Sequence, residues 1–360
     1  SGYAMALSHP VRGFACYAGH ERSGIAEERA QGLSAMINVR FPEVVADLVV
    51  GGVTLMGGLD GAAPSVASFV GKDEIVRTGM YALRGQGCAI ALLHGITDSV
   101  SYSSQAAFGL GEGTYMIASG PSYDSVTNAV SIKAASGLDS PAVKLMFGDW
   151  LWWNDDVNGM MLVSPQAFAG GILAALSPEQ SSLNKALSGI VGSQKSGLTG
   201  SSATYSTAEL STLFTAGIDV ICNPAPGGSY WAVRCGHNAS SKAIVNGDNY
   251  TRLTNYLASS LAGGMGAYVG QVVNDTLFSD IRATLLGFLS SLLSQGILAV
   301  QNGELPYSVV CDSTNNPQTR TALGYVQADV AVRYQGINEK FVVNLQGGTS
   351  VTVTSGEGSA

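Results

Sequence analysis

The segment 149–156, "DWLWWNDD", combines residue types that could bind and cleave a carbohydrate. A pair of carboxylates beside a sugar-stacking surface can act as acid and base on a glycosidic bond. Trp152, Asp155 and Asp156 would line such a pocket. The alternative is structural, because clustered tryptophans commonly carry packing while an acidic turn faces water. The packing interpretation is favoured, and a glycan-binding protein or α/β hydrolase is kept as an alternative function.

Histidine and cysteine residues provide two further candidate sites. His94 follows an apolar run and lies near Asp98, and α/β enzymes place catalytic groups at the carboxyl ends of parallel strands. A possible zinc ligand set consists of Cys16, His20, Cys235 and His237. The spacing is unusual for zinc, and a cysteine is commonly a small buried hydrophobic residue. We therefore expect a hydrogen-bonded histidine at the strand end and no metal.

Three glycines in "FGLGEGT" (108–114) are spaced loosely like a phosphate-binding loop. They precede a predicted strand instead of following one, which is the reverse of a dinucleotide fingerprint. Turn glycines are the favoured interpretation. No GxSxG, HExxH, Walker-type GK[ST] or CxxC motif occurs in the sequence. We expect no catalytic residue and no cofactor.

Apolar runs that alternate with helical patterns predict the elements that carry these residues. Continuous apolar runs, typical of strands buried on both faces, occur at 88–94, 113–119 and 142–150. Helical patterns occur at 64–83, 100–108, 122–136, 166–176 and 178–188, with a further possible helix at 24–37. Shorter strands are predicted at 218–222 and 229–235, after an exposed loop at 192–207. The alternation of strands and helices predicts a mostly parallel α/β layer.

The last third of the chain has a different pattern. A helix is predicted over 274–299, with one apolar stripe formed by Leu277, Ile281, Leu285, Phe288, Leu289 and Leu292. A period of two over 326–335 and 341–346 predicts two strands joined by a short turn. The expected fold class is therefore α/β, or α+β overall, with a parallel layer followed by a C-terminal helix and β-hairpin. We divide the chain into an N-terminal segment (1–56), an α/β domain (57–248), a C-terminal domain (249–346) and a tail (347–360).

Composition limits the classes of partner. Charged residues make up 12% of the 360, about half the share usual in soluble domains, which favours a surface that meets other subunits. The net charge of −8 and the lack of a basic run argue against nucleic acid. No uninterrupted apolar stretch reaches the ~18 residues of a membrane span, so we expect no membrane insertion. The five cysteines are odd in number and irregularly spaced, which argues against a disulfide framework and for a reducing compartment.

Motifs in the second half of the chain follow the order found in contractile tail sheath proteins, and the chain resembles that family. Residues 274–299 are similar to the family's long helix, which starts after Asn-Asp and ends in a Gly-x-Leu turn. "YSVVCDSTNNP" (307–317) is similar to its apolar strand that leads into Cys-Asp and Asn-Pro; the matching residues are Cys311, Asp312, Thr314, Asn316 and Pro317. Residues 324–345 are similar to its closing strand pair.

Upstream, the match is less complete. Trp231 and Arg234 fit the family's Gly-x-x-x-Trp-Gly-Ala-Arg-Thr strand, although Ala232 and Cys235 depart from it. A Gly-Gly-x-Asp-Gly motif is matched by Gly57, Gly58, Asp60 and Gly61. The segment 164–174 lacks the second proline and inner glycine of a family motif, and the Pro-x-x-Pro turn of the closing hairpin is absent. The resemblance spans roughly 57–346 and is strongest after 270.

The resemblance implies a structural subunit and no enzyme. Sheath proteins form stacked hexameric rings around an inner tail tube and contract to drive the tube through a bacterial envelope. Terminal arms join neighbouring subunits by adding strands to their sheets. The inter-subunit strand residues implied here are Val326, Ala328, Val330, Val332, Tyr334, Phe341, Val343 and Leu345.

The expected partners are therefore other copies of the chain, the inner tube protein, and the baseplate and tail terminator proteins. The expected location is a bacteriophage tail assembled in the host cytoplasm. We expect the partner arm to lie N-terminal to Ser1, and residues 1–360 alone to be largely monomeric. A baseplate-associated module that shares the C-terminal domain is a further alternative.

Overall fold

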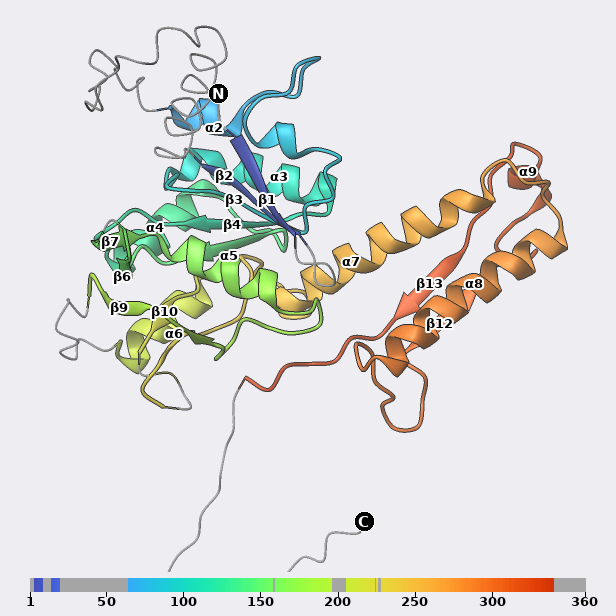
Figure 1. The fold of residues 1–360 in the computed structure, drawn as a ribbon. Coiled ribbons are helices and arrows are strands. Elements are labelled where there is room, and N and C mark those ends of the chain that lie inside the picture. Colours follow the sequence, from blue (N-terminus) through green and yellow to red (C-terminus); the bar gives the residue numbers. More distant parts are fainter. Residues whose placement is uncertain are drawn as a thin grey trace, which may run out of the picture.

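The computed structural model describes the backbone of residues 3–8 and 14–19, and residues 64–157, 159–195, 205–223, 225 and 228–339 in full. Its main body contains a five-stranded sheet in the order β1-β2-β3-β4-β5 (Figure 1). The strands are β1 (Tyr3–Ser8), β2 (Phe14–Gly19), β3 (Ile90–Leu93), β4 (Tyr115–Ser119) and β5 (Val143–Met146). β2 to β5 are parallel, and β1 is antiparallel to β2. The predicted, mostly parallel layer is confirmed.

The three central strands form where the sequence has continuous apolar runs. Every residue of β3, β4 and β5 is buried, as expected for strands covered on both faces. β1 and β2 were not predicted, because their alanine- and glycine-containing sequences have few β-branched residues. The helix predicted over 24–37 lies outside the described residues.

Helices cover both faces of this sheet. One face packs against α3 (Tyr102–Glu112), α4 (Val126–Ser136) and α6 (Thr207–Thr215), and the other against α5 (Pro165–Ala175). The side chain of Ser125 accepts a hydrogen bond from the backbone N–H of Asn128 and thereby caps α4. α6 begins with a reciprocal capping box between Ser206 and Glu209. The start of α4 is therefore close to that of the helix predicted over 122–136.

The helix predicted over 64–83 is wrong in its extent. α2 (Val66–Val70) ends at Gly71, and a 3-10 helix, η2 (Gly79–Leu83), follows a loop. Gly71 has a φ of 72°, and a Cβ at this position would lie 1.9 Å from the carbonyl oxygen of Thr78. Only glycine fits this close approach, so the helix stops there.

The helix predicted over 178–188 is also wrong. This segment forms turns and the short strand β8 (Ala186–Leu187), which pairs with β11 (Trp231–Val233). β11 also pairs with β10 (Ile221–Cys222). A second small sheet has the order β7-β6-β9, formed by β6 (Leu151–Asp155), β7 (Gly159–Val163) and β9 (Ile190–Ser193).

α7 (Asp248–Met265) leaves the body and connects it to a C-terminal lobe (Figure 1). After the 3-10 helix η4 (Gly266–Tyr268), the lobe contains α8 (Asp275–Ser294), β12 (Tyr307–Val310), α9 (Gln318–Thr321) and β13 (Asp329–Val332). Five of the six predicted stripe residues of α8 are buried, and Phe288 packs partly buried against the same cluster. The helix predicted for this region is therefore confirmed.

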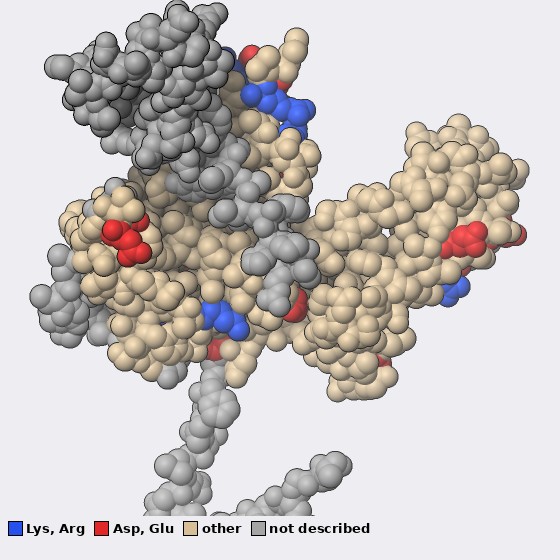
Figure 2. All heavy atoms as spheres, in the orientation of Figure 1, with Lys and Arg blue, Asp and Glu red and all other residues tan. Residues whose placement is uncertain are grey.

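α8 is the one helix in the described part of the chain that is long and apolar enough to cross a membrane by length and composition. Its apolar stripe packs in the lobe core with side chains of α7, β12 and β13. One face of an amphipathic helix explains this composition without a bilayer. On the side of the molecule drawn in Figure 2, charged side chains form small, scattered groups.

The cysteines depart from the sequence expectation in one respect. Cys88, two residues before the buried strand β3, is disulfide-bonded, whereas Cys235 and Cys311 are buried thiols. The described residues thus include one disulfide-bonded cysteine, whereas the sequence argued against a disulfide framework and for a reducing compartment.

Candidate functional site

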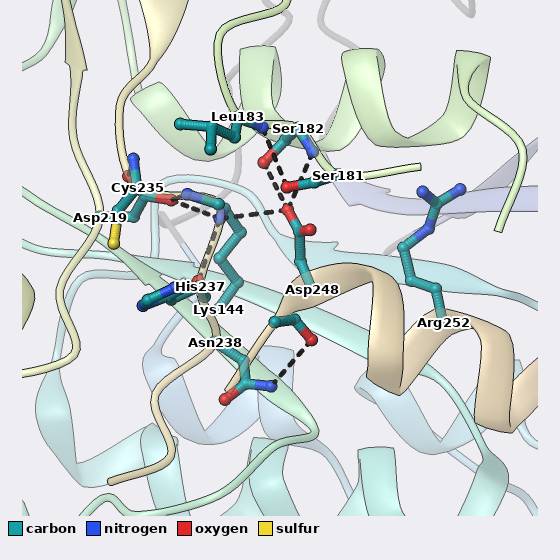
Figure 3. Close-up of polar contacts among 12 residues, drawn as sticks. Lys144, Ser181, Ser182, Leu183, Asp219, Cys235, His237, Asn238, Asp248 and Arg252 are labelled. Carbon is teal, nitrogen blue, oxygen red and sulfur yellow. Dashed lines mark hydrogen bonds and ion pairs between the residues drawn. The ribbon is translucent and has the colours of Figure 1, made fainter. Parts of the chain in front are cut away.

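A buried ion cluster joins β5 to the start of α7 (Figure 3). Lys144 lies within the apolar strand β5, and its Nζ atom is 2.6 Å from Oδ2 of Asp219 and 3.6 Å from Oδ2 of Asp248. All three side chains are at most 1% exposed. Burial lowers the pKa of Lys144, but the two carboxylates outweigh this effect and the net pKa is raised. Lys144 also donates to the backbone carbonyl of His237.

Asp219 is held by backbone donors as well as by lysine. Its Oδ1 accepts hydrogen bonds from the N–H groups of Val220 and Cys235, and its Oδ2 accepts one from Gly236 at 2.7 Å. The residue lies beside β5, because the N–H of Asp219 donates to Leu145 at 2.8 Å. Lys144 and Asp219 are therefore neighbours on adjacent, hydrogen-bonded segments of backbone.

Asp248, the first residue of α7, fixes the direction in which this helix leaves the body. Its Oδ2 accepts hydrogen bonds from the backbone N–H and the hydroxyl of Ser182. A carboxylate in the first turn also interacts favourably with the helix dipole. Its Oδ1 is buried without a hydrogen-bond partner among the described residues.

Arg252, one turn further along α7, binds the C-terminal end of α5. Its guanidinium donates to four backbone carbonyls, those of Leu173, Leu176, Ser177 and Gln180. Burial lowers its pKa, while the charge of Asp248 opposes this change. These bonds satisfy carbonyls at the end of α5 and in the turn that follows it. The helix predicted over 178–188 does not form, because this segment pairs with β11 instead, and the N–H of Asn184 donates to the carbonyl of Val233 at 2.8 Å.

In the C-terminal lobe, residues of the Cys-Asp and Asn-Pro motif form a set of hydrogen bonds between the turn after β12 and the segment before β13. Asp312 accepts hydrogen bonds from the backbone and hydroxyl of Thr314, which turns the chain after β12. The buried side chain of Asn316 bonds Gln327 in both directions, donating to its carbonyl and accepting from its N–H at 2.6 Å. Cys311 is buried in the lobe core, and Pro317 immediately precedes α9. The motif therefore fixes the connection between β12 and β13.

The motif residues from the first two thirds of the chain lie either in and beside strand β11 or outside the described residues. Trp231 begins β11, and Arg234 follows it and donates its backbone N–H to Val220 at 2.9 Å. Gly57, Gly58, Asp60 and Gly61 lie outside the described residues.

The first of the two closing strands is shorter than predicted and pairs within this chain. β13 is antiparallel to β12, with Val332 opposite Tyr307. The predicted apolar side packs, partly buried, on the α8 core, as seen for Val326, Ala328, Val330, Val332 and Tyr334. Phe341, Val343 and Leu345 lie outside the described residues. The outer edges of β12 and β13 carry no further strand among the described residues.

Residues 333–339, which we call the strap, run from β13 back to the body (Figure 1). The ring of Tyr334 stacks on Tyr250 of α7 at 6.2 Å, and its hydroxyl lies 2.9 Å from Thr254. At the end of the strap, Oε1 of Glu339 lies 2.7 Å from Nε2 of His237. The strap therefore ties the chain beyond the C-terminal lobe to the same loop that supplies a carbonyl to Lys144.

We predict that Glu339→Gln loosens the strap without unfolding the protein. A partly exposed contact of this kind contributes about 0.2–1 kcal/mol, so the effect is local. Backbone amides of 334–339 should exchange hydrogen several-fold faster, with no change in α8. Glu304→Gln, which removes a contact to Arg333 at the other end of the strap, is the matched control and should leave residues 337–339 unchanged. Equal exchange in all three proteins would contradict the prediction.

Comparisons with known proteins give matches by structure. No family model and no curated protein matches the sequence. The PVC sheath complex of an extracellular contractile injection system, in its contracted state, has a TM-score of 0.60 at 17% identity, over 73% of this chain and 71% of that chain. The contracted helical sheath of the anti-feeding prophage has a TM-score of 0.59 at 13% identity, over 72% and 70%.

This chain has the fold of contractile sheath proteins. A chain of the contracted anti-feeding prophage baseplate also shares it, with a TM-score of 0.59 at 14% identity over 74% of each chain. The resemblance inferred from sequence motifs is thus confirmed at the level of the fold.

Within this sheath fold, the tryptophans and aspartates of the segment 149–156 lie in two different environments, the strand β6 and a cavity. Trp152, Trp153 and Asp155 lie on β6, and the N–H of Val157 donates to Asp155 in the hairpin turn. Trp150 donates its ring N–H to the carbonyl of Gly120 at 3.2 Å. These contacts favour the packing interpretation.

Asp149 has a different surrounding. It lines a cavity of about 640 Å³ at the carboxyl ends of β4 and β5, and none of the three tryptophans is among the described lining residues. It accepts hydrogen bonds from the Tyr205 hydroxyl at 2.7 Å and from the Lys195 N–H at 2.9 Å. Burial raises the pKa of Asp149, and burial followed by the charge of Asp149 raises that of Tyr205. The sequence did not predict this Asp–Tyr pair, because Tyr205 lies far along the chain.

An acid-sensitive contact borders this cavity. Hydrogen bonds from the Lys195 ammonium and then from the Ser206 N–H lower the pKa of Glu209 from 4.5 to about 2. A carboxylate with a lowered folded-state pKa stabilises the fold above the unfolded value, and this contribution is lost as pH falls from 4.5 to about 2.

We predict that Glu209→Gln lowers the thermal midpoint modestly at pH 6, because solvent screens this exposed pair. The difference from the unaltered protein should vanish as the pH approaches 2. Melting curves across this range measure it, with Glu74→Gln, in an exposed pair with Lys72, as the matched control. A difference that stays constant with pH would contradict the assignment.

The remaining chemical candidates fall on separate parts of the fold. Burial lowers the pKa of His94 at the end of β3, and Asp98 caps the 3-10 helix η3 (Ser99–Ser101). No group of three or more metal-ligating side chains occurs in the described residues, and the side chains of Cys16 and His20 are outside them.

The prediction of turn glycines over 108–114 holds for one position only. Gly109 and Gly111 lie inside α3, whereas Gly113 ends this helix with a φ of 64°. A Cβ at Gly109 would lie 2.7 Å from the carbonyl oxygen of Thr114, which explains a glycine in the helix interior.

Proposed function

We propose that this chain is a structural subunit of a contractile tail sheath and that it has no catalytic site. The observation that carries the proposal is the sheath fold, shared with two contracted sheaths over more than 70% of this chain. The role of the chain would be mechanical, and its chemistry would consist of contacts between copies of itself.

The C-terminal lobe supports this proposal with its two-stranded sheet. Two strands are marginal alone, and a ladder with outer edges offers unpaired N–H and C=O groups to another strand. We propose that arms of neighbouring subunits complete this sheet by β-augmentation, which joins subunits through backbone hydrogen bonds. The predicted strand residues from Val326 to Leu345 would take part on this chain.

Exposed apolar side chains support contacts over the same lobe. They occur on the connections around α8, α9 and β13, and include Val269, Val272, Leu305, Leu323 and Tyr325, each at least 60% exposed. Apolar surface of this kind marks sites of protein association when it is grouped. The low charge content of the chain agrees with extensive burial between subunits.

We further propose the assembly that the family resemblance implies. Copies would stack as hexameric rings around an inner tube, between baseplate and terminator proteins, in a bacteriophage tail assembled in the host cytoplasm. Contraction would proceed between two packings of the same subunits, with no nucleotide consumed. The proposed domain boundaries are 57–248 for the α/β domain and 249–346 for the C-terminal domain, which would connect neighbouring subunits.

Negative-stain electron microscopy of the natural protein that contains residues 1–360, purified without other tail proteins, tests the proposal. Long hollow tubes with a helical repeat are the expected result. Particles that stay dispersed at high concentration would contradict it.

A second candidate function is a baseplate-associated module. It is favoured by the similarity to a chain of the anti-feeding prophage baseplate. The same images distinguish the two functions, because a baseplate module would form single rings and would not grow into tubes.

A further inference from the structure

We propose that Lys144 and Asp219 condense spontaneously to form an intramolecular isopeptide bond, with Asp248 transferring the two protons that the nitrogen loses. The reaction joins Nζ of Lys144 to Cγ of Asp219 and releases the former Oδ2 as water. No oxidant, metal or other reactant is consumed. The product is a neutral amide in place of a buried ion pair.

The reacting atoms are already in place (Figure 3). Nζ of Lys144 lies 2.6 Å from Oδ2 of Asp219, and a carbon–oxygen bond is ~1.2 Å long. The nitrogen is therefore no farther than about 3.8 Å from the carboxyl carbon, and a near-attack geometry requires ~3–3.5 Å. Both side chains are at most 1% exposed, so bulk water has little access to compete for the carboxyl group.

Backbone donors are placed where the reaction develops negative charge. Attack on Cγ creates a tetrahedral oxyanion on Oδ1, which already accepts hydrogen bonds from Val220 and Cys235. Preorganised N–H groups of this kind stabilise an oxyanion strongly in a dry site. The N–H of Gly236 contacts Oδ2, the oxygen that leaves.

Asp248 supplies the proton transfer that the reaction requires. An ammonium cannot attack, so Nζ must first give a proton to a neighbouring carboxylate, and Oδ2 of Asp248 lies 3.6 Å away. Its Oδ1 is buried with no partner in the described structure, so an ionised Asp248 is poorly solvated and can accept a proton. Asp248 passes this proton to Oδ2 of Asp219 before the attack. After the attack, Asp248 takes a second proton from the nitrogen and passes it to the same oxygen, so the amide nitrogen keeps one hydrogen and Oδ2 leaves as water. The attacking form need only arise once per molecule, because the water leaves.

The position of the proposed bond in the fold would make this part of the body resist mechanical opening. It would close the chain between β5 and the segment that pairs with it, across β6, β7, α5 and α6. A covalent link over a long loop restricts the unfolded chain and resists opening of this part of the body. That benefit rests on the proposed sheath function, whereas the condensation itself does not.

Intact-mass spectrometry of the purified 360-residue chain, denatured and with its disulfide reduced, tests the proposal. The expected mass is lower than the sequence mass by one water molecule. Trypsin should leave the peptide bond after Lys144 uncut and release a branched peptide that contains Lys144 and Asp219. The full sequence mass together with normal cleavage at Lys144 would overturn the proposal, whatever electron microscopy shows of tubes.

Variants assign the roles of the residues. Lys144→Gln should have its full sequence mass, and Asp248→Asn should leave most of the chain uncondensed. Lys133→Gln is the matched control, because Lys133 is also buried but, among the described residues, donates to the carbonyls of Ala216 and Ala239 and to no carboxylate. It should still lose one water. If a variant does not fold, the mass and the branched peptide of the unaltered chain decide the question alone.

Discussion

Replacing Lys144 with alanine is expected to destabilise the protein by about 3–5 kcal/mol. The substitution leaves Asp219 and Asp248 buried without the cation that lies between them. An uncompensated buried charge is far more costly than a lost surface contact, because it has no water to solvate it. Urea unfolding should show a much lower midpoint for Lys144→Ala than for the unaltered protein.

Lys72→Ala provides the control for this prediction. Its ammonium is also paired, with Glu74 at 3.7 Å, but the two side chains are 76% and 67% exposed. A surface pair of this kind contributes little to stability. A similar, small change in both variants would show that the cluster is not a stabilising element.

The stability of a second variant, Asp248→Asn, separates the effect of losing the lysine charge from any effect of a covalent bond at the same lysine. Asp248→Asn keeps the size of the side chain and its contact with Ser182, and it leaves Lys144 paired with Asp219. Its stability should fall by less than that of Lys144→Ala. Comparison of the two variants therefore measures how much the loss of the lysine itself costs.

Much of the fold is predictable from the sequence because its signals are local. The strands β3 to β5 follow from continuous apolar runs, and α8 from a regular stripe with Asn274 as its cap. β1 and β2 lack such a signal. The helix expected over 178–188 fails because this segment pairs with β11, which is distant in sequence.

The ion cluster was not predicted, although one signal for it is present. Lys144 stands in the middle of "AVKLMF", a run assigned to a strand buried on both faces. A lysine in such a strand requires a buried carboxylate, since an isolated charge is too costly there. The sequence alone cannot say which aspartate is the partner, because Asp219 and Asp248 are brought to it by the tertiary fold.

The β12–β13 ladder leads to the prediction with the largest effect on assembly. Antiparallel strands alternate between residues that bond across the ladder and residues whose N–H groups point outward. The N–H of Arg333 donates to the carbonyl of Pro306 across the ladder. Its neighbour Val332, opposite Tyr307, therefore directs its own N–H to the outer edge of β13.

Val332→Pro should abolish tube formation by the natural protein while leaving the subunit folded. Proline removes the outward donor that an incoming strand needs, and it is tolerated on an edge strand. Negative-stain images should show dispersed particles where the unaltered protein forms tubes. Circular dichroism should show unchanged helix content, because α7 and α8 do not depend on this N–H.

Val332→Ala distinguishes the lost hydrogen bond from lost packing. Val332 packs partly buried against the α8 core, so alanine and proline both remove side-chain contacts, but alanine keeps the N–H. If strand addition at this edge joins the subunits, the alanine variant forms tubes and the proline variant does not. If both variants form tubes, the outer edge of β13 is not the joint, and the subunits must be held by the exposed apolar side chains of the lobe. If neither does, packing of the lobe sets assembly, and the backbone donor has no separate role.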